Sequence, residues 1–407
     1  MASAQFSKLE QQAGQIADPI QRLRFLRQET SKLSWWKRIT RFAGPRLQSI
    51  HLRHWLHAAA WGAAAVALVM VPGPRPSGTA ATLRREKGLL IPGQAQASDN
   101  GAAQIDADIP RVWRVENAQL TEVYSNGLRI DDTFTISNRP RLRFPIFPLN
   151  GASKALSNGS EPVGIVFHTT ETLLAPFEED QNRRLQQIGR NLLEVIRKEQ
   201  AYHYVIDRFG RVYRVVREQD AANHAGKSVW ADSTGIYVNL NDSFLAVAFE
   251  TQTDVGATTV TPAQIQSGRM LVEMLRSKYR ISAEDCVTHA QVSVNPQNMR
   301  IGDHTDWAGN FPFASLGLPV NYAIAPASLY AFGFEYDDAF LHATGGGWKG
   351  LEAADDQVRR QATAESVTVA QYRAILRHRY KDISTFLEAL HSSANSNPNL
   401  DNSEGGN

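Results

Sequence analysis

Histidine and aspartate side chains that follow short apolar runs are the residues of this sequence best suited to chemistry. His168 closes the run VGIVFH, His289 closes CVTH, and Asp306 lies in the polar segment MRIGDHTDWAGN. Catalytic groups gather at the ends of strands and on loops, where a rigid scaffold holds them at the surface. Two imidazoles and a carboxylate around an open position are suitable ligands for a catalytic zinc ion. The spacing permits such a site, although ordinary hydrogen-bonded polar residues would give the same pattern.

Six short motifs follow one another along the middle of the chain. They are GIVFHTT, YHYVIDRFGRVYRVV, HAGKSVW, AVAFET, VTHAQVS and DHTDWAGNFPF. In this order they resemble the motifs of the N-acetylmuramoyl-L-alanine amidase type 2 family, which is similar to the peptidoglycan recognition proteins and the phage lysozyme-type amidases. The resemblance spans roughly residues 140 to 320. It implies hydrolysis of the amide bond between N-acetylmuramic acid and the L-alanine of the peptidoglycan stem peptide.

The resemblance also implies a zinc site and its ligands. His168 in GIVFH and His289 in VTH match the first and second zinc ligands of the family. Asp306 leads the stretch DWAGNFPF and matches the third ligand, whereas Asp303 is a rival that lies outside that frame. We therefore expect Zn²⁺ as the cofactor, held by His168, His289 and Asp306.

Three further residues match positions that the family uses in catalysis. Glu250, which closes AVAFE, matches the catalytic glutamate and would act as general base. His304 stands two residues before the third ligand, where bacterial members usually have lysine, and Tyr202 matches a tyrosine of the phage and recognition-protein branch. A strand-end ion pair for Glu250 and sheet packing for Tyr202 are the structural alternatives. We expect ordinary hydrogen-bonding roles for His203 and His224.

The chain departs from the family pattern in the loop that carries the third ligand. The segment from His289 to Asp306 is longer than usual, and Trp307-Ala308 replaces a Pro-Gly pair. A non-catalytic peptidoglycan-binding module of the same fold is the alternative function, and a zinc hydrolase of another amide is a third. Such binding modules typically lack a ligand, so the three filled positions and Glu250 favour the enzyme.

The motifs must be positioned by strands and helices that alternate between about residues 160 and 320. We predict buried strands at the apolar runs VGIVFH, FLAVAFET and CVTH. Residues Asp207 to Gly210 are predicted to form the turn of a hairpin. Helices are expected over 181–199, with Ile188, Leu192, Val195 and Ile196 on one face, and over 262–279, where Thr261 caps and Pro262 begins the helix. This alternation predicts an α/β fold with a mixed central sheet flanked by helices.

The N-terminal part of the chain has the pattern of a membrane signal anchor. Residues 1–54 are basic, residues 55–72 are apolar and nearly uncharged, and residues 73–110 are a linker rich in Gly, Pro, Ala and Gln. The positive-inside bias predicts a single transmembrane helix that leaves the rest of the chain on the outer, periplasmic side of the cytoplasmic membrane. A cleaved signal peptide is the rival, but its charged region would be unusually long.

The remaining segments complete the predicted organisation. Residues 111–325 form the zinc amidase domain with an N-terminal β extension, 326–391 a small helical C-terminal appendage that begins with a loop-like stretch, FEYDDAFLHATGGGWKG, and 392–407 a disordered tail.

Cys286 is the only cysteine, which excludes an intramolecular disulfide and is typical of a small buried side chain. The net charge of +2 gives no reason to expect a nucleic-acid partner. The expected partners are peptidoglycan or muropeptides, and the membrane through the N-terminal helix.

Overall fold

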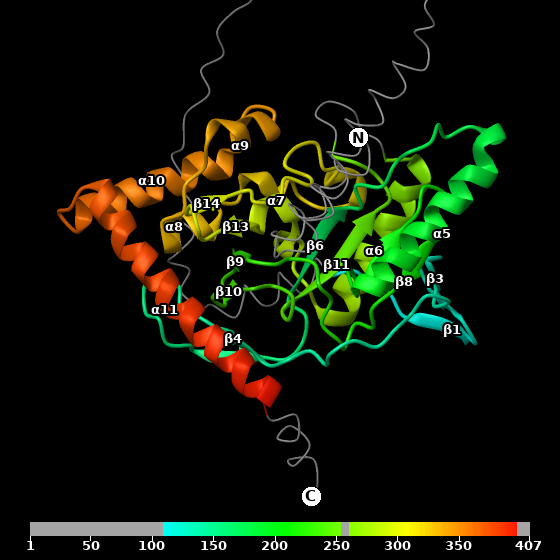
Figure 1. Cartoon of the computed structure of the whole chain (residues 1–407), viewed down its shortest axis with the longest axis horizontal. Coiled ribbons are helices and arrows are strands. Elements are labelled where there is room, and N and C mark those ends of the chain that lie inside the picture. Colours follow the sequence, from blue (N-terminus) through cyan, green and yellow to red (C-terminus); the bar gives the residue numbers. More distant parts are fainter. Residues whose placement is uncertain (1–108, 254–259, 397–407) are drawn as a thin grey trace, which may run out of the picture. The chain divides into compact units, whose positions relative to one another are not determined.

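The computed structural model describes residues 109–253 and 260–396, which all belong to one compact unit, Pro92–Asn407 (Figure 1). The predicted basic segment and the predicted anchor, 1–54 and 55–72, lie outside the described residues, as does nearly all of the linker. Across the described ranges, no helix is both long enough and apolar enough to cross a bilayer. The membrane anchor therefore stays a prediction.

A mixed eight-stranded sheet forms the centre of the domain, in the order β1-β2-β3-β8-β7-β11-β6-β12. Its strands are β1 Arg114–Ala118, β2 Thr121–Tyr124, β3 Arg129–Asp131, β6 Gly164–Thr169, β7 Tyr204–Ile206, β8 Val212–Arg214, β11 Phe244–Phe249 and β12 Cys286–Thr288. The central strands β7, β11, β6 and β12 run parallel, whereas β7 and β8 form the predicted antiparallel hairpin. Strands β6, β11 and β12 are buried along their whole length, as their apolar runs predicted, and Cys286 is buried.

One long helix covers each face of the sheet. Helix α6, Pro262–Tyr279, packs Leu271 and Leu275 against the side of β6 and β11 that carries Phe167 and Phe249. Its N-terminus has the predicted form, because Thr261 and Gln264 exchange side-chain to backbone hydrogen bonds in a capping box.

Helix α5, Asn182–Glu199, covers the opposite face. It buries Leu185, Gly189, Leu193 and Ile196, whereas Val195 is 49% exposed. The predicted apolar stripe is buried at Ile196 and partly buried at Leu192, but it was wrong at Val195, since the helix turns its one glycine toward the sheet. That glycine lies beside the Glu250 carboxylate, so the close approach of helix and sheet determines the buried face.

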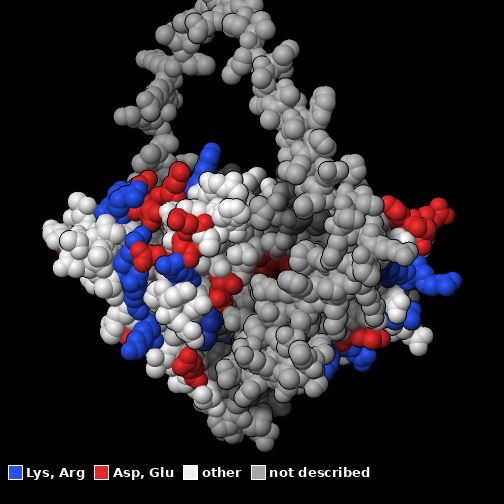
Figure 2. Space-filling model, turned by 45° about the horizontal axis from the view of Figure 1, so that its top comes forward, with Lys and Arg blue, Asp and Glu red and all other residues white. Residues whose placement is uncertain are grey.

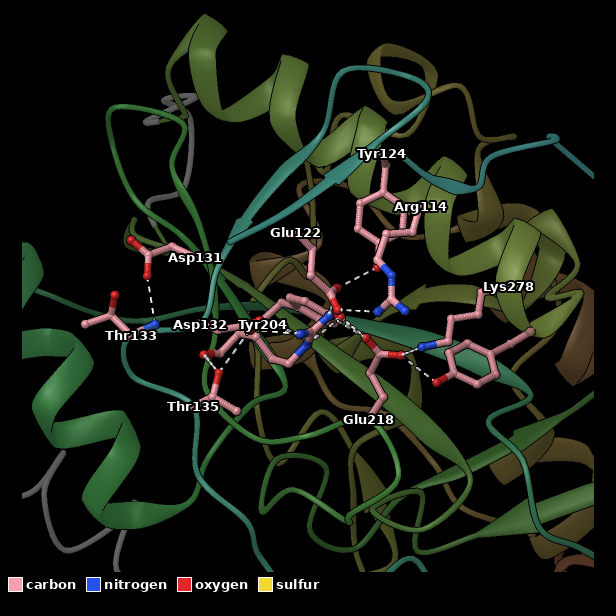
Figure 3. Close-up of polar contacts among 12 residues, drawn as sticks. Arg114, Glu122, Tyr124, Asp131, Asp132, Thr133, Thr135, Tyr204, Glu218 and Lys278 are labelled. Carbon is pink, nitrogen blue, oxygen red and sulfur yellow. Dashed lines mark hydrogen bonds and ion pairs between the residues drawn. The ribbon is translucent and has the colours of Figure 1, made fainter. Parts of the chain in front are cut away.

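The N-terminal β extension belongs to the same sheet. Strand β3 pairs in parallel with β8, and Arg214 of β8 forms ion pairs with Glu122 at 2.6 Å, Asp132 at 2.8 Å and Glu218 at 3.3 Å. Figure 3 shows the acceptors of this network, with Lys278 of α6 bonded to Glu218. The extension is thus fixed to the domain by buried charge pairs as well as by backbone hydrogen bonds.

Several shorter elements complete the structure around the sheet. The strands are β4 Phe144–Ile146, β5 Ser157–Gly159, β9 Val229–Ala231, β10 Ile236–Val238, β13 Val294–Asn295 and β14 Arg300–Ile301. The helices are η1 Glu179–Gln181, η2 Ala283–Asp285, α7 His289–Val292, η3 Ala314–Leu316, η4 Asn321–Ala323, α8 Ala327–Phe332, α9 Asp338–Ala343, α10 Lys349–Ala364 and α11 Val369–Ser396.

The C-terminal helices differ from the prediction in two ways. The stretch 334–350 was predicted to be a loop but contains α9, because the Asp337 side chain accepts the backbone N–H of Phe340 and so starts a helix. Helix α11 continues to Ser396, beyond the predicted end at 391. Residues 397–407 of the predicted tail lie outside the described residues.

These helices share an apolar core with the sheet domain. Phe332, Leu351 and Ile383 pack with Phe147 and with Ile236 of β10. Ion pairs reinforce this packing. Arg373 of α11 bonds Asp355 of α10 at 2.9 Å and Glu335 at 2.6 Å, and blue and red side chains lie side by side over these helices on the left of Figure 2. The C-terminal region is therefore part of the domain rather than a separate appendage.

Candidate metal centre and active site

Two parallel strands bring the two predicted histidine ligands together. In the pairing of β12 with β6, Thr288 lies opposite Phe167. The residues that come next, His168 and His289, therefore lie at the same end of the two strands. The centroids of their rings are 4.5 Å apart. Both side chains are buried. The register of the sheet thus explains why two histidines 121 positions apart in sequence meet.

Asp306 completes a cluster of three side chains that could hold a metal ion. Its carboxylate lies 3.2 Å from Nδ1 of His168 and 2.9 Å from Nδ1 of His289, and one ligand atom from each residue lies within 4.8 Å of the others. Burial by itself would raise the pKa of Asp306, but the charge of His289 and hydrogen bonds from both rings hold that pKa well below its ordinary value. Two nitrogen ligands and one ionised oxygen ligand at this spacing fit a tetrahedral zinc ion with a fourth position open.

Asp303, the rival third ligand, lies outside this cluster. Its side chain accepts a hydrogen bond from Asn295 at 2.9 Å, and its other oxygen is 4.0 Å from Nε2 of His304. The ring of His304 stacks on the ring of His289, with centroids 4.5 Å apart. His304 therefore lies against the cluster of His168, His289 and Asp306 without being one of its three members.

Glu250 follows strand β11 and is buried at the same edge of the sheet. Ala248 pairs with His168, so Glu250, two residues further on, projects to the same face of the sheet as His168. Its carboxylate accepts the backbone N–H of Arg208 at 3.1 Å. Burial raises the pKa of Glu250 to about 7, although the hydrogen bond from Arg208 opposes this rise. A carboxyl with a pKa near neutrality is suited to proton transfer.

The region around His168 also contains Tyr202, His203 and His224, which make different contacts. Tyr202, which has a left-handed backbone with φ of 59°, places its ring 4.9 Å from the ring of His168. His224 places Nδ1 3.2 Å from Nε2 of His168. His203 instead bonds the backbone of Ala246 and Asp220, and burial together with the charge of Arg141 lowers its pKa to about 3.

His224 is the residue whose part in the site the sequence reasoning missed. The contact of His224 with Nε2 of His168 orients the imidazole whose Nδ1 faces Asp306, as partners of metal-binding histidines do. His224 belongs to the motif HAGKSVW, which the sequence analysis identified. The spacing between His168 and His224 in the sequence, however, does not predict that the two side chains are in contact. His203 has the ordinary hydrogen-bonding role that we predicted.

Several solved structures resemble parts of this chain. AmpDh3 from Pseudomonas aeruginosa, in complex with anhydromuramic pentapeptide, shares 18% identity over 54% of this chain and 73% of that chain, with a TM-score of 0.31. AmiD from E. coli shares 22% identity over 49% and 65%, with a TM-score of 0.28. Drosophila peptidoglycan recognition protein SD shares 18% identity over 38% and 79%, with a TM-score of 0.25.

The sequence itself matches a family model over part of its length. Residues 158–308 match the model described as N-acetylmuramoyl-L-alanine amidase, and this segment includes His168, Glu250, His289 and Asp306. A search of curated proteins found no match. The match covers less than half of the chain, and the family is therefore assigned to this segment as a similarity.

Proposed function

We propose that this protein is a zinc-dependent amidase that hydrolyses the bond between N-acetylmuramic acid and L-alanine in peptidoglycan or muropeptides. The observation that carries the proposal is the buried cluster of His168, His289 and Asp306 within a segment of the amidase family. When bound, zinc supplies Lewis-acid polarisation of the amide carbonyl and of a water molecule.

The protein's own side chains carry the proton transfers and the charge stabilisation. Glu250, as the general base, takes a proton from water and then passes it to the leaving amine of L-alanine. His304 or Tyr202 donates a hydrogen bond to the oxygen of the scissile carbonyl as it gains negative charge. A donor of this kind contributes about 3 kcal/mol in other hydrolases.

A non-catalytic peptidoglycan-binding module remains the second candidate function. The complete ligand set and the raised pKa of Glu250 favour catalysis over binding alone.

We further propose that residues 55–72 anchor the protein in the cytoplasmic membrane with the amidase domain on the periplasmic side, on the basis of the charge and apolar pattern of the sequence. Fractionation of cells combined with protease treatment of spheroplasts tests this location, and recovery of the full chain in the soluble cytoplasmic fraction would exclude it.

Zinc analysis paired with mass spectrometry of the products tests the proposed reaction. The wild-type chain should bind one zinc ion and release free stem peptides from sacculi. His168→Ala and Asp306→Ala should lose both properties, whereas the control Asp303→Ala should keep zinc. Zinc binding and cleavage by the two ligand variants would exclude the assigned site. Products cut within the stem peptide would exclude the assigned bond.

A further inference from the structure

The loop that carries Asp306 has a backbone conformation that needs support from outside the loop. Trp307, directly after the ligand, has φ of 59°, and Asn310 has φ of 60°. Residues other than glycine seldom adopt this left-handed region, and they keep it only where the surrounding structure holds them. The position of the third ligand therefore depends on what contacts residues 307–310.

Two aromatic side chains hold the carbonyl groups of this loop. The hydroxyl of Tyr322 donates to the carbonyl of Trp307 at 2.7 Å. The indole N–H of Trp348, the residue that caps α10, donates to the carbonyl of Ala308 at 2.7 Å. The rings of Tyr322 and Trp348 stack on each other, with centroids 5.0 Å apart. Together they fix the backbone one and two residues after Asp306.

The C-terminal region also touches the loop on both sides of the ligand. An added Cβ on Gly302 would lie 2.1 Å from the ring of Phe340 in α9, and one on Gly309 would lie 3.1 Å from the carbonyl of Thr344. Glu335 exchanges backbone hydrogen bonds with Ile301 and Met299 at 2.9 Å. Helices α8 to α10 lie beside β13, β14 and α7 in Figure 1, as these contacts require. The C-terminal region thus encloses the loop on the side away from the sheet.

We propose that the C-terminal region positions the third zinc ligand, with Trp348 as the principal positioning residue. The proposal rests on the proposed zinc site, and it assigns a role to helices that the amidase-family segment, 158–308, does not include. Trp348 touches neither the ligand side chains nor the reacting atoms. It acts through the carbonyl of Ala308 and so sets where the carboxylate of Asp306 lies relative to His168 and His289.

Zinc affinity of full-length variants, measured against a competing chelator, tests this role. Trp348→Phe keeps an aromatic ring but removes the indole donor, and its dissociation constant for zinc should rise about tenfold, as for partners that orient metal ligands elsewhere. The matched control is Trp230→Phe, because Trp230 is also buried and its indole N–H donates to Asp285 at 2.9 Å, in another part of the core. Its zinc affinity should stay close to that of the wild type.

A second readout separates positioning from general stability. A merely structural role for Trp348 would lower the unfolding temperature of the metal-free chain and leave its zinc affinity equal to that of Trp230→Phe, and that result would overturn the proposal. If Trp348→Phe does not fold, Tyr322→Phe removes the neighbouring donor with less loss of volume, and the same comparison with Trp230→Phe decides. A wild-type chain that binds no zinc would instead refute the proposed function itself.

Discussion

Replacing Glu250 by glutamine should abolish catalysis and at the same time stabilise the fold above neutral pH. Burial of Glu250 raises its pKa from the ordinary 4.5 to about 7, so folding disfavours the ionised form. One pKa unit corresponds to about 1.4 kcal/mol, and the rise therefore costs the folded state on the order of 3 kcal/mol above pH 7. The cost disappears as the pH falls toward 4.5, because the carboxyl is then protonated in both states. Glutamine has no such charge and keeps an oxygen for the N–H of Arg208.

Urea denaturation of chelator-treated wild type and Glu250→Gln at pH 8 and pH 5 measures this effect. The variant should be more stable at pH 8 by up to about 3 kcal/mol, and the difference should shrink at pH 5. Glu194→Gln, on the exposed face of α5, is the control and should change stability by less than about 0.5 kcal/mol. Cleavage of sacculi at pH 8 should fall by about 10²- to 10⁴-fold in Glu250→Gln. Equal stability at both pH values would refute the burial argument, and retained cleavage would refute the role as base.

Two further substitutions test contacts that position the site and the sheet. His224→Ala should raise the dissociation constant for zinc about tenfold, because the first ligand loses the partner that orients its ring. His378→Ala, whose side chain is 78% exposed, is the control in the same chelator competition, and equal affinities would contradict the assignment. Arg214→Met leaves three carboxylates without their guanidinium and should destabilise the fold by about 3–5 kcal/mol in urea denaturation. Arg211→Met, which breaks a half-exposed pair, should cost less than about 1 kcal/mol, and similar losses in both variants would argue against the buried network.

The local elements of the domain followed from short-range sequence signals. Apolar runs bounded by polar residues predicted β6, β11 and β12, and the Thr-Pro pair before residue 263 predicted the start of α6. These signals work because apolar composition within a strand and the capping of a helix are set by residues adjacent in the chain. The buried face of α5 did not follow, since the close approach to the sheet at Gly189 decides which side of the helix is covered.

The assignment of Asp306 rather than Asp303 as the third ligand was predicted from a motif, whereas its position beside the two histidines is visible only in the structure. The DWAGNFPF frame favoured Asp306, and the structure brings Asp306, rather than Asp303, to the two histidines. Spacing along the chain could not make this choice, because both aspartates follow His289 within one polar loop. Asp306 is followed directly by the turn at Trp307, whose carbonyl accepts the hydroxyl of Tyr322, so contacts distant in sequence surround this carboxylate.

The amino-acid sequence by itself determined the similarity of residues 158–308 to the amidase family, the order of strands and helices in that segment, and the residue types that can hold a metal. Only the tertiary structure decided that His224 contacts the first ligand, that Glu250 is buried with a raised pKa, and that the C-terminal helices enclose the Asp306 loop. The physical reason is that motifs record local propensity and residue chemistry. Sheet register, desolvation and contacts between distant segments arise only when the chain packs.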